Sequence, residues 1–184
     1  GREAFLHSLD WKISGNALWP VRFLHEPAFS DFGTFADEYS VRHFYLHCEK
    51  VAFCEGIFFY RQDNPDAITK KVSPKLLDAA DNNYRLWELC RAYGFAEDVL
   101  ALRAFYTLRS LIKAQALVFD HPELRAQAGL VDQCFENIQS VEFSEALQHH
   151  LVRKAGLAKR ALYSRAQRSK RWLDIAAWLS ALGG

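Results

Sequence analysis

Several residue types and patterns are scarce in this chain of 184 residues, and each scarcity narrows the class of protein. Methionine is missing altogether and the first residue is Gly1, so we expect the sequence to be part of a longer translated protein. The four cysteines form no CxxC pair, which favours reduced thiols over a disulfide scaffold. No apolar run approaches the ~18–20 residues of a membrane span, and no signal peptide opens the chain.

The residues that are present favour a folded domain with an uneven distribution of charge. Half of them are hydrophobic and 14% are aromatic, which is too apolar for a disordered chain. The net charge is only +1, yet eight basic residues and a single acid, Asp174, lie between Ala146 and Gly184. The rest of the chain is therefore acidic. A basic tail on an acidic body predicts an anionic partner for the tail.

The pattern divides the chain into two regions. Residues 1–72 mix helical and strand patterns, whereas residues 73–184 show helical patterns only. In the first region we predict a helix over 36–48. A short strand at 50–54 and a second, aromatic-rich strand at 57–61 follow it, with a turn at Glu55-Gly56 between them and a loop over 62–66.

The second region carries clear signals for helix starts and stops. Ser73-Pro74 suits a helix start and Gly94 a helix end. A second helix is predicted over 96–118, and His121-Pro122 interrupts it. Ser144 is predicted as the cap of a later helix.

The order of motifs in the first region resembles the acceptor-side half of family-2 glycosyltransferases of the GT-A fold. That family has an acidic motif opening a helix, a strand, an aromatic–Arg strand and an Ile-Thr loop. The matching residues here are Asp37, Glu38, Lys50–Cys54, Tyr60-Arg61 and Ala67-Ile68-Thr69. A weaker similarity, to the segment that positions an acceptor, covers Lys12–Phe23 with Trp19. The resemblance implies an α/β fold: a partial, Rossmann-like GT-A domain over 1–72 and a mainly helical extension over 73–184.

The resemblance also implies a reaction, the inverting transfer of a sugar from a nucleotide-sugar donor to a glycan or lipid-linked acceptor. A sugar hydroxyl is a poor nucleophile, so a carboxylate must take its proton, and the start of a helix stabilises that carboxylate. Asp37 is the expected base, with Glu38 as the alternative. Arg61 and Lys70 or Lys71 are expected to bind the diphosphate. The family also uses a divalent metal, Mn or Mg, but the chain has no Asp-x-Asp motif and no donor-binding half, so no metal ligand is named.

Plainer interpretations stand beside these. The acids near the helix start could serve only the helix dipole, and Arg61 could form a surface ion pair. His43 and His47 have i, i+4 spacing, which suits zinc, but without a third ligand helix-face histidines are the better interpretation.

The basic tail has two competing interpretations, a solvated helix face and contact with an anionic membrane through 153–179. Trp172 and Trp178 directly follow the basic run and favour the membrane. Nucleic acid is not expected, because no stacking platform or recognition motif is present. We expect a cytoplasmic protein, peripheral at the inner membrane face. The alternative function is a non-catalytic helical scaffold at the membrane surface in glycan assembly.

Overall fold

The computed structural model describes residues 1–10, 12, 17–57, 59, 63 and 71–182. The chain divides into two compact units, Gly1–Val72 and Ser73–Gly184, which are described separately. This division coincides with the predicted boundary between the mixed and the helical region. No helix in the described ranges is both long and apolar enough to cross a bilayer.

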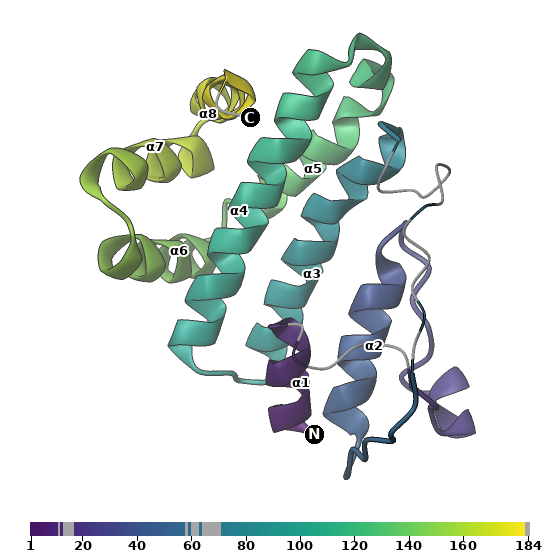
Figure 1. The fold of residues 1–184 in the computed structure, drawn as a ribbon. Coiled ribbons are helices and arrows are strands. Elements are labelled where there is room, and N and C mark those ends of the chain that lie inside the picture. The colour runs from purple at the N-terminus through teal and green to yellow at the C-terminus, as the bar shows by residue number, and fades with distance from the viewer. Residues whose placement is uncertain (11, 13–16, 58, 60–62, 64–70, 183–184) are drawn as a thin grey trace. The chain divides into compact units, whose positions relative to one another are not determined.

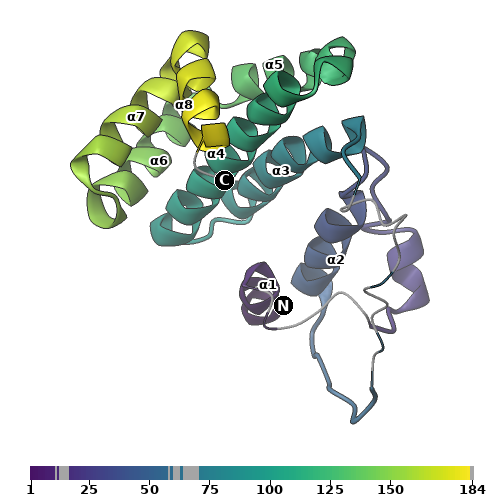
Figure 2. The same cartoon turned by 45° about the horizontal axis from the view of Figure 1, so that its top comes forward.

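The described residues of unit 1 form three helical segments and irregular chain. They are α1 (Arg2–Leu9), the 3-10 helix η1 (Val21–Leu24) and α2 (Ala36–His47). Helices α1 and α2 pack against each other, as Figure 2 shows. An aromatic cluster forms where η1 meets α2: the ring of Phe44 lies 5.3 Å from those of Trp19 and Phe23 and 4.8 Å from that of Phe29, measured between centroids. Aromatic burial therefore holds η1 onto α2 without a sheet.

The α/β fold class predicted for residues 1–72 is wrong. Every regular element in the described part of the chain is a helix, and no residue there lies in a strand. The predicted strand 50–54 is irregular, and so are Ile57 and Phe59 of the predicted strand 57–61; residues 58, 60 and 61 lie outside the described residues. A strand needs backbone hydrogen bonds from a neighbour, and aromatic content favours a strand only where a sheet exists to accept it.

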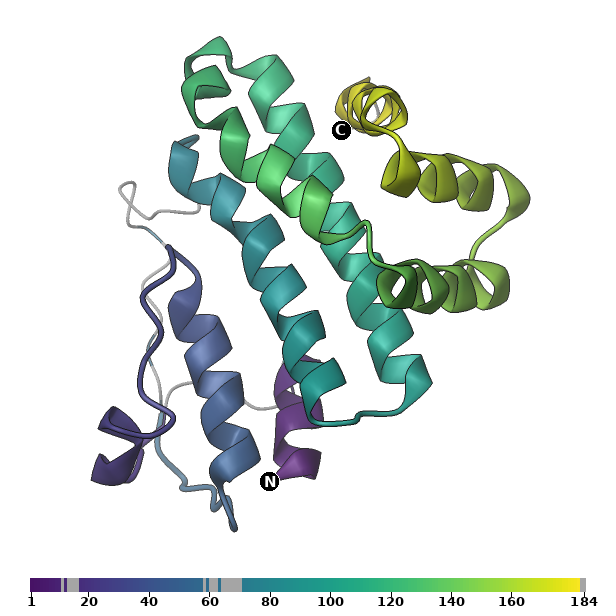
Figure 3. The same cartoon turned by 180° about the vertical axis from the view of Figure 1, so that it is seen from behind.

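Unit 2 is a bundle built around one long helix, α4 (Figure 1). Its elements are η2 (Pro74–Leu77), α3 (Asp78–Ala92), α4 (Glu97–Asp120), η3 (Pro122–Gln127), α5 (Ala128–Asn137), α6 (Val141–Lys154), α7 (Leu157–Arg168) and α8 (Lys170–Leu182). Helices α3, α5, α6 and α8 all pack against α4, and the view from behind shows α5 lying along α3 and α4 (Figure 3).

Local signals set the helix ends of unit 2. Gly94 follows α3 with a φ of +59°, a conformation that glycine adopts without strain. The predicted cap Ser144 is wrong: α6 is capped by Ser140, whose hydroxyl accepts a 3.2 Å hydrogen bond from the backbone N–H of Phe143. Ser144 lies one turn inside α6, where its hydroxyl donates to the carbonyl of Ser140 at 3.0 Å.

The buried face of α4 should dominate the stability of unit 2. Leu108 is completely buried in this face, so Leu108→Ala is expected to lower the free energy of unfolding by about 2–5 kcal/mol. Urea unfolding followed by far-UV circular dichroism measures this loss. The control is Leu130→Ala at a side chain that is 48% exposed, where a change below about 1 kcal/mol is expected. Equal losses for the two variants would contradict the packing described for α4.

Candidate functional site

Helix α2 carries the two candidate catalytic acids in its first turn. The helix starts at Ala36, as predicted, and its N-cap residue is Phe35, which offers no side-chain cap. Asp37 and Glu38 therefore lie beside the unsatisfied N–H groups at the positive end of the helix dipole. Both the catalytic interpretation and the plainer dipole interpretation require this placement.

The two acids differ in their surroundings. Glu38 contacts the buried Arg42 one turn further on, with 3.4 Å between Oε2 and a guanidinium nitrogen, and that nitrogen also donates to the Glu38 carbonyl at 2.8 Å. Arg42 is only 5% exposed, and burial lowers its pKa while Glu38, and then Asp37, act to raise it. Glu38 thus compensates a buried positive charge.

Asp37 forms no such ion pair with Arg42. Its side chain is exposed, and no ion pair to it is found in the part of the chain that the structure describes. A general base must reach the hydroxyl that it deprotonates. Of the two candidates, Asp37 is therefore the exposed carboxylate without an ion pair in the described ranges, a distinction that the sequence left open.

The predicted diphosphate-binding residues stay a prediction. Arg61 and Lys70 lie outside the described residues, and Lys71 is exposed. Within the described ranges no three His, Cys, Asp or Glu side chains are grouped to hold a metal ion. The described site therefore consists of the acids of α2 and their immediate surroundings.

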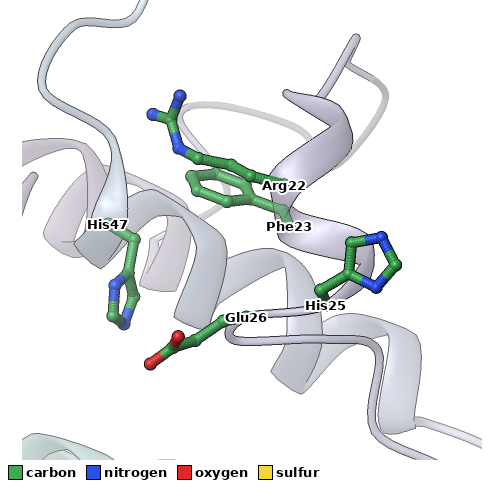
Figure 4. Close-up of a pocket in the computed structure, with 5 residues that line it drawn as sticks. All are labelled: Arg22, Phe23, His25, Glu26 and His47. Carbon is green, nitrogen blue, oxygen red and sulfur yellow. The ribbon is translucent and has the colours of Figure 1, made fainter.

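An open pocket of about 400 Å³ lies at the other end of α2 (Figure 4). Its lining residues are Arg22, Phe23, His25, Glu26 and His47. The Arg22 guanidinium carbon lies 5.1 Å from the centroid of the Phe23 ring. Figure 4 shows the Glu26 carboxylate extending to the side on which the His47 ring lies, whereas His25 points away from both.

This pocket offers cationic, acidic and aromatic groups to one polar ligand. Arg22 and Phe23 belong to the segment whose sequence resembles an acceptor-positioning segment, but sequence analysis did not identify His25 or Glu26. His47 follows Asp37 by ten positions in the same helix, which corresponds to about 15 Å along α2. A ligand that contacted both the pocket and Asp37 would have to extend over this distance.

Comparison with protein-family models, curated proteins and solved structures finds no match to this chain. The resemblance to family-2 glycosyltransferases therefore depends on the residues quoted above.

The histidine pair of α2 gives a measurable electrostatic signature. The rings of His43 and His47 lie 5.0 Å apart, centroid to centroid, and burial together with His47 lowers the pKa of His43. His47→Gln should raise this pKa only part of the way to its ordinary value of about 6.5, because the burial remains. NMR titration of the ring protons measures the change, with His121→Gln in unit 2 as the control.

The same shift predicts the direction of a stability change. Because the pKa of His43 is lower in the folded state, the unfolded chain takes up the proton first. The contribution of His43 to stability is therefore complete above about pH 6.5 and declines as the pH falls towards its folded-state pKa. A pKa for His43 above its ordinary value, or one unmoved by His47→Gln, would contradict this account.

Proposed function

We propose that this chain supplies the acceptor side of a glycosyltransferase, in which Asp37 takes the proton from the attacking acceptor hydroxyl. The observation that carries the proposal is the separation of roles in the first turn of α2. Asp37 is exposed and unpaired in the described structure, while Glu38 is held by Arg42. Together with the motif order in the sequence, this favours a catalytic over a purely structural pair of acids.

The chemistry assigned to Asp37 is a single proton transfer. As the acceptor oxygen forms its bond to the anomeric carbon, its proton passes to a carboxylate oxygen of Asp37 and the nucleoside diphosphate leaves with the bonding electrons. The proposed base lies in the first turn of α2, at the positive end of the helix dipole. A divalent metal, Mn or Mg, would counter the charge of the leaving diphosphate when bound.

The pocket beside His47 extends this proposal to binding. Hydroxyl groups both donate and accept hydrogen bonds, and the pocket supplies donors in Arg22 and His47 and an acceptor in Glu26. An acceptor of several sugar units could occupy the pocket while its terminal hydroxyl reaches Asp37. This arrangement suits a glycan or lipid-linked oligosaccharide better than a monosaccharide.

Asp37→Asn in the complete protein tests the proposal. It is expected to lower kcat at least 100-fold with little change in KM, because general-base catalysis contributes about 10²–10⁴ in rate and the asparagine keeps the shape of the side chain. Glu38→Gln is the matched control. It should reduce kcat less than tenfold and lower Tm instead, because it removes the partner of buried Arg42. Transfer is measured with a panel of nucleotide sugars and oligosaccharide acceptors.

Each other result has a definite meaning. Full activity of Asp37→Asn would remove Asp37 from the mechanism, and a larger loss for Glu38→Gln would exchange the two roles. Absence of transfer with every donor, in a folded complete protein, would refute the proposed activity. The alternative function, a non-catalytic helical scaffold, would then be preferred.

A further inference from the structure

Helix α8 has apolar residues on two opposite sides. One side packs into unit 2, where Leu173 and Ala177 are completely buried. The opposite side carries Ile175, Trp178 and Leu182, spaced three and four residues apart. Trp178 is 58% and Leu182 66% exposed. Since a helix that is apolar all round is normally buried, the outer side of α8 indicates a contact beyond unit 2.

Basic residues border this apolar side where α7 turns into α8. The turn falls at Ser169, which has an extended backbone, and Figures 1 and 2 show the two helices following one another around it. Arg165, Arg168 and Arg171 are all exposed there. The guanidinium carbon of Arg165 lies 4.8 Å from the centroid of the Trp172 ring, which links the basic and the apolar residues.

The other positive charges of the tail are partly used within unit 2. Arg153 pairs with Asp98, and Lys170 pairs with Asp132. Lys159 lies 5.0 Å from the centroid of the Phe105 ring. By contrast, no carboxylate partner of the three arginines at the turn is found in the described ranges, and α7 contains no acidic residue. Three arginines without a carboxylate partner therefore lie beside the apolar side of α8. Lys154 and Arg160, for which no ion pair is found in the described ranges either, lie further away along the tail.

We propose that this surface docks on an anionic phospholipid membrane. The α7–α8 surface is defined by Arg165, Arg168, Arg171, Trp172, Ile175, Trp178, Leu179 and Leu182. Its apolar residues would enter the boundary between headgroups and acyl chains, and its arginines would contact the phosphates. Helix α8 has 13 residues and is about 20 Å long, shorter than the ~30 Å hydrocarbon core, which suits a helix lying along the surface.

Other occupants fit this surface less well. Nucleic acid would satisfy the arginines but leave Trp178, Leu179 and Leu182 in water. A second copy of the chain, related by two-fold symmetry, would bury the apolar side but bring two sets of arginines together. A membrane with anionic headgroups offers phosphates to the arginines and an apolar environment to the tryptophan and leucine side chains. The proposal does not depend on glycosyl transfer.

Co-sedimentation of the full chain with vesicles tests the proposal. Vesicles of phosphatidylcholine alone are compared with vesicles that also contain phosphatidylserine. We expect binding to the anionic vesicles, weakened by salt, and little binding to the neutral ones. The triple variant Arg165→Gln, Arg168→Gln and Arg171→Gln should lower the partition coefficient about 100-fold, from about 1 kcal/mol for each basic residue at the surface. Trp178→Ser with Leu182→Ser should also lower it while leaving the charge unchanged.

The matched control removes the same charge elsewhere in unit 2. Lys75, Lys113 and Arg125 are exposed and lie outside α7 and α8, so their triple change to Gln should leave most of the binding intact. Far-UV circular dichroism verifies the fold of each variant. Equal losses for both triple variants, equal binding to neutral vesicles, tighter binding to duplex DNA, or a dimer that dissociates on Leu182→Ser would each overturn the proposal.

Discussion

The packing of unit 2 depends on the burial of helix α4. Helix α4 also buries polar side chains. Burying a polar group without a hydrogen-bond partner lowers the free energy of unfolding, so these side chains need partners. The three buried polar residues of α4 each form at least one hydrogen bond, although none to the Nε atom of Arg103 is found in the described ranges: Arg103 donates to Asn83 of α3, Thr107 to the carbonyl of Arg103, and Gln115 to Asp174 of α8. The bonds from Arg103 and Gln115 connect α4 to α3 and α8, whereas the Thr107 bond lies within α4. In particular, the bond from Gln115 fixes which side of α8 faces inwards.

The sequence predicted the helices of unit 2 better than the fold of unit 1, for a physical reason. Helix boundaries depend on local chemistry such as Gly94 and Pro122, which acts within a few residues. A strand depends on a neighbour that local sequence does not supply, and the residues predicted as strand at 50–54 have none in the described structure. Local sequence also did not determine which of two serines, Ser140 or Ser144, caps α6. Ser144 accepts a 2.9 Å hydrogen bond from Gln167, 23 residues away.

In the candidate site, too, features set by neighbouring residues could be predicted from the sequence, and features set by tertiary contacts could not. The helical start that places Asp37 and Glu38 together was predictable. The burial of Arg42 was not, because arginine is rarely buried, although its i, i+4 spacing from Glu38 could have identified the pair. The pocket beside His47 needed the structure, because Arg22 and Glu26 reach it from a different segment of the chain. The surroundings of Asp37 and Glu38 thus differ because Arg42 is buried, and that burial depends on the tertiary structure.

A count of the charged residues in a sequence overestimates the electrostatic field that acts on a binding partner. Paired cations such as Arg153 and Lys170 contribute little at a distance, because the opposite charge beside each cancels most of the field. Attraction across a Debye length of about 8–10 Å depends on charges that remain unpaired and close together. The three arginines at the turn between α7 and α8 meet this condition in the described structure, and the exposed apolar side of α8 lies directly beside them. The folded bundle therefore converts a diffusely basic tail into one localised surface that is both cationic and apolar.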